Sequence, residues 1–547
     1  MKTVIIGGVA GGMAAATRLR RLDETAEIVV FEAGRYVSFS NCGLPYFIGG
    51  VIEDRGKLLS HSPESFRTRF QIDVNLEHEV VSIDPAAKEV TVRNSAGDSV
   101  HAYDQLIIAT GALANNPDVL QSDRTSSLRT IDDMDRIHAT LNEPSTRSVV
   151  VIGGGYIGLE AAENIRRRSF TTTLVQRGPR IFPALDPEMV AALHDELIAH
   201  GVTVITGRQV RTVESATVTL DDGTELEADL IIDATGVAPA SAVAENAGLR
   251  IGDSGGIWVD AQHRTSDPFI FAVGDAAEKT DAITGLPTLV ALAGLANRHG
   301  RATADVIAGT TEDAVPALGT SIIGVFGITA AATGWNETRL REGNRPHRII
   351  HIHPPSHASY YPGASPLAMK LLIDPSTDLI LGAQVVGRDG VDKRIDVLSV
   401  AISAGITASA LKNLELAYAP QYGSAKDPIN LAGYVAENTA PGQMRTVQWH
   451  ELDALSRTGS TILDVRTTEE FDKSHIPGAI NIPLDEIRDR ADEIPDGDVI
   501  VHCQVGQRGN TATRILAQTG HTVANLDGGY LTWHAGISQT SNSKEQS

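Results

Sequence analysis

The sequence predicts an α/β protein with two dinucleotide-binding domains, because one pattern occurs twice along the chain. Residues 3–6 are a short apolar strand, a glycine-rich turn follows at residues 7–12, and a helix extends to about Leu22. A second strand, residues 27–31, ends at Glu32. The same order returns at residues 148–176. This order is typical of a fold that brings backbone N–H groups to a pyrophosphate.

The first turn departs from the usual G-x-G-x-x-G pattern, because Val9 stands where the second glycine is expected. The strands on both sides still favour a dinucleotide site, with Glu32 accepting a hydrogen bond from a ribose hydroxyl. The turn residues expected at this site are Gly7, Gly8, Ala10, Gly11 and Gly12.

The second turn has the complete pattern in Gly153, Gly155 and Gly158. The strand after it ends in Gln176 and Arg177, where an NADH site would carry an acid. An acid would repel a 2′-phosphate, whereas a neutral glutamine with Arg177 and Arg180 nearby could accept one. This position favours NADPH over NADH, and use of both stays open.

The composition limits the possible partners. A chain of 547 residues should hold three to five domains, and a net charge of −22 disfavours nucleic acid and anionic membranes. Two cysteines cannot form a disulfide framework and fit a reducing cytoplasm. Arg18, Arg20 and Arg21 directly follow the first apolar run, so it is interpreted as strand and turn rather than a signal peptide. We expect a cytoplasmic protein with no membrane span and no metal site.

Two further segments carry a resemblance. Residues 106–111 and 269–277 are apolar strands that end in small-residue turns, with Thr110 and Gly111 in the first and Asp275 in the second. Over residues 1–315 the chain thus resembles the flavoprotein reductases with two dinucleotide sites. The resemblance implies FAD at the first site and NAD(P)H at the second. It implies an FAD-binding domain at residues 1–115 and 246–315, with the NAD(P)-binding domain at 116–245.

Cys42 lies in the segment Ser38–Tyr46, with no second cysteine near it in the sequence. This segment resembles the single-cysteine branch of those reductases, which comprises coenzyme A-disulfide reductase, NADH oxidase and NADH peroxidase. A lone redox thiol stores its oxidised state as a sulfenic acid or as a mixed disulfide with a small thiol. The oxidase and peroxidase relatives carry a catalytic histidine in the first turn, and Ala10 stands in its place. That difference argues against oxygen or peroxide as the main acceptor.

Residues 357–363, 417–420 and 424–428 resemble the dimerisation domain of coenzyme A-disulfide reductase, expected here as an α+β domain at 320–440. The resemblance implies a homodimer in which Tyr418 and either Tyr360 or Tyr361 reach the redox cysteine. The residues then expected to contact coenzyme A are Lys426, Arg18, Arg21, Ser38 and Asn41. That family also places a lysine near residues 67–70, where Arg69 is the candidate substitute.

Residues 447–537 resemble a rhodanese domain, an α/β domain in which a loop cysteine carries a persulfide. Strand 499–502 leads to Cys503, and the loop to Gly509 can direct its N–H groups at an anionic sulfur. Arg508 would help to hold an anionic sulfur donor. Asp464, Arg466 and His475 are interpreted as structural, and the polar residues 538–547 are expected to be disordered.

The combination predicts a homodimeric FAD enzyme that uses NAD(P)H to reduce coenzyme A disulfide, coenzyme A persulfide or polysulfide. Cys42 would be the redox thiol and Cys503 the carrier of sulfane sulfur. Two alternatives stay open. One is an NAD(P)H oxidase that acts on oxygen through a Cys42 sulfenate. The other is a sulfur carrier in which Cys503 passes persulfide to a partner protein.

Overall fold

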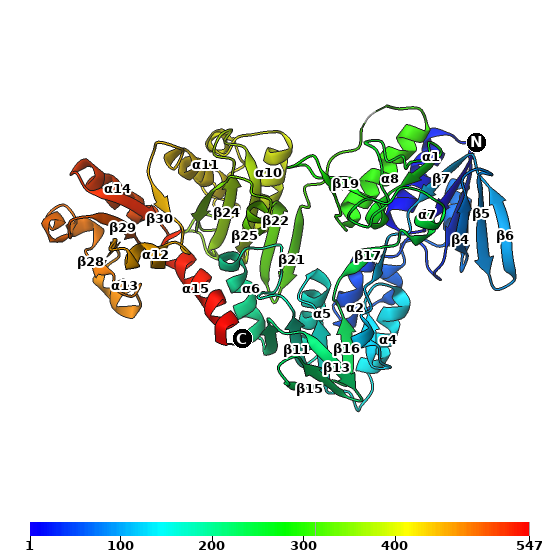
Figure 1. Cartoon of the computed structure of the whole chain (residues 1–547), viewed down its shortest axis with the longest axis horizontal. Helices are drawn as coiled ribbons and strands as arrows, with labels where there is room; N and C mark the ends of the chain where they lie inside the picture. Colours follow the sequence, from blue (N-terminus) through cyan, green and yellow to red (C-terminus); the bar gives the residue numbers. More distant parts are fainter. Residues whose placement is uncertain (312, 546–547) are drawn as a thin grey trace. The chain divides into compact units, whose positions relative to one another are not determined.

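The computed structural model describes residues 1–311 and 313–545, with side chains described as far as residue 540. The chain divides into two compact units. The first contains Met1–Val175 and Gln209–Gly319, and the second contains Gln176–Arg208 and the chain from Thr320 onward (Figure 1). No helix of the described residues is both long and apolar enough to cross a bilayer.

The first unit begins with a parallel sheet in the order β18-β7-β1-β2-β3. Its strands are β1 (Lys2–Ile6), β2 (Glu27–Glu32), β3 (Asp73–Leu76), β7 (Gln105–Ile108) and β18 (Ile270–Ala272). Helix α1 (Ala10–Leu22) follows the first turn and packs against α8 (Ala293–Ile307). These elements confirm the strands and the helix that the sequence predicts here. Adjacent parallel strands bring their carboxyl ends, and the turns that follow, to one edge.

The second glycine turn lies in another parallel sheet of this unit, in the order β11-β10-β16-β9. Its strands are β9 (Thr125–Ser127), β10 (Ser148–Ile152), β11 (Thr171–Gln176) and β16 (Leu230–Asp233). Its helices are α4 (Ile131–Leu141) and α5 (Tyr156–Arg167). The unit also contains two three-stranded antiparallel sheets: β4 (Glu79–Asp84), β5 (Glu89–Asn94) and β6 (Gly97–Ala102), then β13 (Val210–Glu214), β14 (Thr217–Leu220) and β15 (Glu225–Glu227).

The second unit contains an antiparallel sheet in the order β21-β22-β25-β24-β23. Its strands are β21 (Ser321–Val325), β22 (Ile328–Gly334), β23 (Arg348–Ile352), β24 (Leu367–Ile373) and β25 (Ile380–Gly387). Helices α10 (Val391–Ser403) and α11 (Pro428–Asn438) bury apolar side chains against it. Helix α6 (Pro187–Ala199) also contacts the sheet. Every residue of β25 is buried as a result, because both faces of a central strand are covered.

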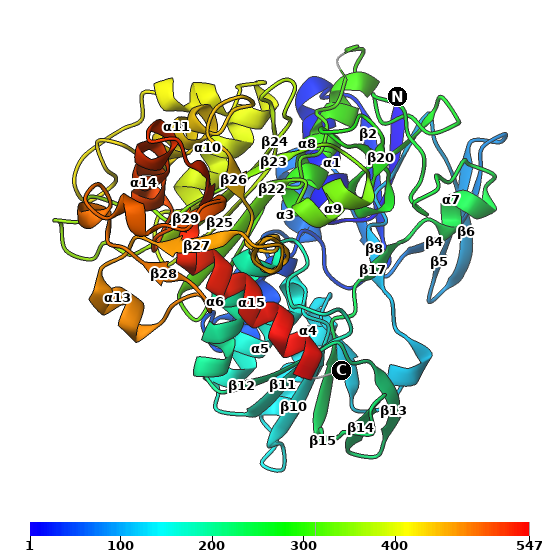
Figure 2. The same ribbon diagram turned by 60° about the vertical axis from the view of Figure 1, so that its left-hand side comes forward.

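A parallel sheet in the order β26-β30-β29-β27-β28 forms the last part of this unit. Its strands are β26 (Thr446–Val447), β27 (Thr461–Asp464), β28 (Ile480–Asn481), β29 (Asp498–His502) and β30 (Thr522–Leu526). Its helices are α12 (Leu452–Arg457), α13 (Thr468–Lys473), α14 (Gln507–Gln518) and α15 (Gly529–Glu545). Helix α15, red in Figures 1 and 2, runs beside α6 of the same unit.

This helix corrects the expectation that the chain is disordered from residue 538 onward. Residues 538–545 continue α15, which begins at Gly529, and residues 546–547 lie outside the described part of the chain. The polar composition of the tail suggested disorder, but the helix that precedes it already packs along α6 and against Trp449. Extending an anchored helix needs no new nucleus, so weak helix formers can follow it.

Candidate active sites

The first glycine turn forms a tight cradle. Gly7 has a φ of +103°, and a Cβ there would stand 2.3 Å from the carbonyl oxygen of Ala109. The N–H of Gly8 donates to Glu32 Oε2 at 2.6 Å, and the N–H of Gly34 donates to Glu32 Oε1 at 2.8 Å. The turn and the acid that ends β2 therefore lie together, as a dinucleotide site requires. The residues present fit FAD.

The second glycine turn is equally tight at its end and open at its centre. A Cβ on Gly158 would stand 1.8 Å from the carbonyl oxygen of Gly153, whereas one on Gly155 would meet nothing within 4 Å. The open position leaves room for a pyrophosphate to approach the backbone. Arg177 is exposed, while Arg180 donates to the Leu185 carbonyl and to Thr338 Oγ1. Arg177 is therefore the more available of the two for a 2′-phosphate.

Cys42 is exposed, and its Sγ donates to Asn41 Oδ1 at 3.6 Å. Burial by the surrounding loop, together with the charges of Glu160 and Asp275, raises the pKa of the Cys42 thiol. Asp275 is the middle residue of the turn η4 (Gly274–Ala276), and the effect of its charge on the thiol shows that the structure brings this acid and the cysteine into one region. Ser38 has a φ of +51° and donates its N–H to the Gly8 carbonyl at 2.8 Å. That contact holds the cysteine segment against the first glycine turn.

Sequence reasoning missed two residues beside Cys42. Tyr46, in the short helix α2 (Leu44–Ile48), donates its hydroxyl to Glu160 Oε1 at 3.1 Å. Burial raises the pKa of the Glu160 carboxyl, and burial with the Glu160 charge raises the pKa of Tyr46. A usable signal was present, because Tyr46 ends the Cys42 segment and Glu160 closely follows Gly158. The two side chains place a proton-holding pair next to the Cys42 thiol.

The basic residues expected to contact coenzyme A are already engaged. Arg18 Nε donates to Asp305 Oδ1 at 2.6 Å, and the Arg21 guanidinium lies 5.6 Å from the centre of the Phe70 ring. Arg69 lines a pocket of about 320 Å³ together with His61 and other polar residues. Arg18 and Arg21 would have to exchange or share these partners to bind a phosphate. Their coenzyme role stays a prediction.

The three candidate tyrosines of the second unit make different contacts. Tyr360 and Tyr418 are exposed, and their hydroxyl oxygens lie 2.9 Å apart in a hydrogen bond. This bond raises the pKa of Tyr418. Tyr361 instead places its ring 5.9 Å from that of His357. Tyr360 is thus the residue that pairs with Tyr418, although the reach of either hydroxyl to a redox cysteine stays a prediction.

Lys426 and the loop that carries Tyr418 rest on a buried anchor. Lys426 itself is exposed, but the next residue, Asp427, is buried and accepts from Arg394 Nη2 at 2.9 Å. Asp427 also accepts from the N–H of Ile429 and so caps α11. The fold therefore presents Lys426 at a fixed position on the surface, and its contact with coenzyme A stays a prediction.

Cys503 is fully buried at the end of β29. Its carbonyl accepts from the N–H of Tyr530 at 2.8 Å, and a Cβ on Gly529 would stand 2.5 Å from that carbonyl oxygen. Arg466 is buried, donates to Asp464 and Gln504, and lies 4.5 Å from the Tyr530 ring centre. The structural interpretation of Asp464 and Arg466 agrees with these contacts. The loop from Cys503 leads into α14, whose first-turn N–H groups have no partner within the helix.

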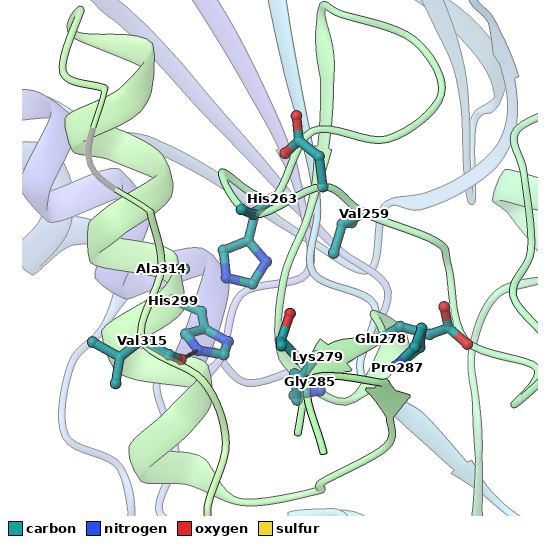
Figure 3. A pocket seen from close by; sticks show the side chains of 12 residues that line it. Val259, His263, Glu278, Lys279, Gly285, Pro287, His299, Ala314 and Val315 are labelled. Carbon is teal, nitrogen blue, oxygen red and sulfur yellow. Dashed lines mark hydrogen bonds between the residues drawn. The ribbon is translucent and has the colours of Figure 1, made fainter. Parts of the chain in front are cut away.

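A small polar pocket lies elsewhere in the first unit (Figure 3). His263, His299 and Lys279 line a space of about 70 Å³. Burial lowers the pKa of His263 to about 3 and that of Lys279 to about 8. The space is far smaller than the several hundred Å³ that an organic cofactor needs. This pocket is therefore not a coenzyme site, and two or more waters would fill it.

The second unit also contains three buried carboxylates close enough to hold a metal ion: Asp186, Glu188 and Glu337. The Lys370 ammonium lies among them, 2.9 Å from Asp186 and bonded to both glutamates. His351 joins the same network, with Nε2 3.0 Å from Glu188 and Nδ1 2.7 Å from Asp527. Lysine thus supplies the positive charge that a cation would otherwise supply. The network ties α6, the antiparallel sheet and the turn before α15 together.

Three family models match this chain. Pyridine nucleotide-disulphide oxidoreductase matches residues 1–300, the dimerisation domain of that family matches residues 320–427, and a rhodanese-like domain matches residues 448–536. A coenzyme A disulfide reductase of Staphylococcus aureus is 37% identical over 439 residues, which cover 80% of this chain and all of the relative.

Two solved structures extend the similarity to nearly the whole chain. The reduced CoADR-RHD of Bacillus anthracis has 44% identity and a TM-score of 0.97, with 98% of both chains covered. An NAD-dependent persulfide reductase from A. fulgidus has 37% identity and a TM-score of 0.92, with 97% of this chain and 100% of that chain covered. A water-forming NADH oxidase from Lactobacillus brevis has 25% identity and a TM-score of 0.77, with 80% of this chain and 98% of that chain covered. The chain is a member of the pyridine nucleotide-disulphide oxidoreductase family with a C-terminal rhodanese-like domain.

Proposed function

We propose that this protein is an FAD-dependent NAD(P)H oxidoreductase that reduces coenzyme A disulfide, coenzyme A persulfide or polysulfide. The observation that carries the proposal is the isolation of Cys42. It stands exposed beside the first dinucleotide turn, and the other cysteine of the chain, Cys503, is buried in the rhodanese-like domain. A thiol without an internal partner needs a small thiol to form a mixed disulfide. Two of the relatives are named as reductases of coenzyme A disulfide and of persulfide.

The reaction of Cys42 follows from thiol–disulfide exchange. Its thiolate attacks coenzyme A disulfide, the substrate S–S bond breaks, and a Cys42–coenzyme A disulfide forms as one coenzyme A thiolate leaves. Bound FAD and NAD(P)H supply the two electrons that reopen this bond. Tyr46 and Glu160 hold a proton at the Tyr46 hydroxyl beside the sulfur. The Tyr360–Tyr418 hydroxyl pair is the proposed donor to the leaving thiolate.

We propose a homodimer, because the dimerisation family model matches residues 320–427 and the tyrosine pair is exposed there. Coenzyme A phosphates would meet Lys426 and the residues around Ser38 and Arg18. Cys503 would carry sulfane sulfur between donor and acceptor. Both cysteines are free thiols, which fits the reducing environment of a cytoplasmic location.

NADPH is the proposed nucleotide, although one relative is described as NAD-dependent. Gln176 followed by Arg177 is the support, because no carboxylate opposes a 2′-phosphate there. An engineered oxidase bound to NADPH carries, among its substitutions, an aspartate-to-alanine change followed directly by an alanine-to-arginine change. Arg177→Ala should raise the KM for NADPH about 10-fold and leave the KM for NADH unchanged. Equal effects on both nucleotides would contradict the assignment.

The test of the reductase is anaerobic NADPH oxidation with coenzyme A disulfide, with glutathione disulfide as the comparison. We expect coenzyme A disulfide to be preferred and two thiols to form for each NADPH consumed. The oxidase alternative predicts the reverse: no anaerobic turnover, and NADPH consumption that depends on oxygen. Similarity to the Lactobacillus oxidase favours that alternative, and Ala10 weighs against it. Transfer of labelled sulfur from Cys503 to a protein without NADPH would support the carrier alternative.

A further inference from the structure

The guanidinium beside Cys503 is already occupied by an acid of the same domain. Arg508, in the first turn of α14, donates through Nη1 and Nη2 to both carboxylate oxygens of Glu470 at 2.7 Å. The two side chains are 35% and 33% exposed, so solvent reaches the pair while Cys503 beneath is buried. A bidentate pair of this kind is strong and directional. An anion that approaches Cys503 therefore meets a neutralised Arg508.

Glu470 is held in this position by the helix to which it belongs. Its N–H donates to Thr467 Oγ1 at 3.3 Å, and its Oε2 accepts from the Thr467 N–H at 2.9 Å, which forms a capping box at the start of α13. Oε2 thus serves both the cap and Arg508. The bond to Arg508 holds the pKa of Glu470 at about 2, so the carboxylate is charged at neutral pH. The Glu470 carboxylate is therefore held in place and negatively charged before any other anion approaches Arg508.

Arg508 is also the cation that an incoming sulfur donor can use. Hydrogen bonding to Glu470 raises the pKa of Arg508, and the nearby Cys503 thiol raises it further. Arg466, the other guanidinium at this loop, is buried and donates to Asp464, Gln504 and the Ser474 carbonyl. Within the part of this domain that the structure describes, Arg508 is therefore the guanidinium that both reaches solvent and faces the reactive sulfur.

We propose that Glu470 competes with the anionic group of the sulfur donor for Arg508, and so determines which donors Cys503 accepts. This inference rests on the proposed sulfur-carrying role of Cys503. The donors are compounds whose sulfane sulfur is bound to an anionic leaving group. The Cys503 thiolate attacks the sulfane sulfur, a Cys503–S bond forms, and the donor S–S bond breaks. The bonding pair leaves with the leaving group, which departs beside Arg508, and no external oxidant or reductant is needed.

Glu470→Gln is the direct test, because glutamine also closes a capping box and removes only the charge. Sulfur transfer to cyanide is measured with thiosulfate, a dianion, and methanethiosulfonate, a monoanion. We expect the KM for thiosulfate to fall about 10-fold, the KM for methanethiosulfonate to fall less, and kcat to stay within about two-fold. Increasing ionic strength should reduce the difference. Unchanged or raised KM values for both donors would overturn the proposal.

Two further variants separate competition from a structural effect. Glu469→Gln makes the same charge change at an exposed neighbouring residue, and should leave both KM values unchanged. In a protein that already carries Arg508→Met, adding Glu470→Gln should not change the KM further, because the two residues act through one interaction. A KM effect that persists without Arg508 would contradict the inference.

Failure of the inference is distinguishable from failure of the proposed function. If the wild-type protein transfers sulfur but Glu470→Gln behaves like Glu469→Gln, only the competition is wrong. If the wild-type protein transfers no sulfur from either donor, the role of Cys503 itself is wrong. Reduction of coenzyme A disulfide through Cys42 should be the same in all of these variants.

Discussion

Cys42 and Cys503 carry the same thiol, but Cys42 is exposed near carboxylates whereas Cys503 is buried near guanidinium groups. Burial of the sulfur and the acids around Cys42 raise its pKa, so these surroundings by themselves do not favour a thiolate. The loop of Cys503 carries Arg508 within the same domain. The difference shows that the rhodanese-like domain itself supplies the charged groups around Cys503. In the proposed mechanism, Cys42 depends on groups from outside its own loop, among them FAD and the proposed tyrosine pair.

The backbone that packs against Cys503 is connected to a network of buried charged side chains. Gly529, which packs on the Cys503 carbonyl, follows Asp527 by two residues, and Asp527 accepts from His351. His351 in turn contacts Glu188, which binds Lys370. Removing one member of such a network leaves an uncompensated buried charge, which costs far more than losing a surface pair. The buried network can be tested at Lys370 and His351, and the more open site of Cys42 at the tyrosine pair and at Glu160.

Lys370→Met should have the largest effect, a loss of about 3–5 kcal/mol in the free energy of unfolding of the second unit. The matched control is Arg457→Met, which breaks an exposed ion pair with Asp453 and should cost less than about 1 kcal/mol. Both are measured by chemical denaturation of the holoenzyme. Equal losses in the two variants would show that the buried network does not support this unit.

The pH dependence of stability should follow His351. Burial alone would lower its pKa, but Asp527 and Glu188 together raise it from 6.5 to about 9. Because the folded pKa exceeds the unfolded one, the stabilisation is full below pH 6.5 and is lost as the pH rises through about 9. The charged groups around His351 are Glu188, Asp527 and Lys370, with His353 nearby, directly after the end of β23.

The measurement is the unfolding midpoint between pH 6 and 10 for the wild type and for His351→Gln, at one fixed protein concentration because the proposed dimer would make stability depend on concentration. The variant should be less stable at the acidic end and should show a flatter decline toward alkaline pH. A decline of equal steepness in both proteins would assign the pH dependence to other groups.

Tyr418→Phe and Tyr360→Phe should each slow coenzyme A disulfide reduction about 100-fold, the scale of a lost general acid. Tyr361→Phe is the control, because Tyr361 contacts His357 instead of Tyr418. Sulfur transfer from thiosulfate through Cys503 should be unchanged in all three. A loss of both activities in the tyrosine variants would mean that the two cysteine sites do not act separately.

Glu160→Gln should have the smallest effect, a lower pKa for the Cys42 thiol. Removing this negative charge favours the thiolate, so alkylation of the reduced holoenzyme at neutral pH should be about 3–10-fold faster. The rate is measured against pH with iodoacetamide, with the exposed Glu53→Gln variant as the control. If the pH profile of the alkylation rate is the same as in the wild type, Glu160 does not influence the reactivity of Cys42.

The parts of this structure that sequence analysis predicted are local in the chain. The strands, glycine turns and acid at Glu32 follow one another within about 30 residues, so spacing and turn chemistry identify them. Both cysteine loops are also continuous segments. The resemblance to known families then supplied the dimerisation and rhodanese-like domains, which their family models confirm.

The missed features depend on residues far apart in the sequence. The Tyr46–Glu160 pair and the Lys370 network join segments separated by more than 100 residues, and no periodicity reports such contacts. One signal was available, since Lys370 is a single charge in the apolar strand Leu367–Ile373, where an unpaired charge is unstable. Glu470 was likewise visible as the fourth residue of a capping box, but its pairing with Arg508 was not.

The most direct measurement is anaerobic NADPH oxidation by the wild type, Cys42→Ser and Cys503→Ser, with coenzyme A disulfide and with coenzyme A persulfide or polysulfide. The account predicts that Cys42→Ser loses both activities. It predicts that Cys503→Ser keeps coenzyme A disulfide reduction within about two-fold and is impaired with the sulfane sulfur substrates. Equal impairment of coenzyme A disulfide reduction in Cys503→Ser and Cys42→Ser would contradict the division of labour between the two thiols.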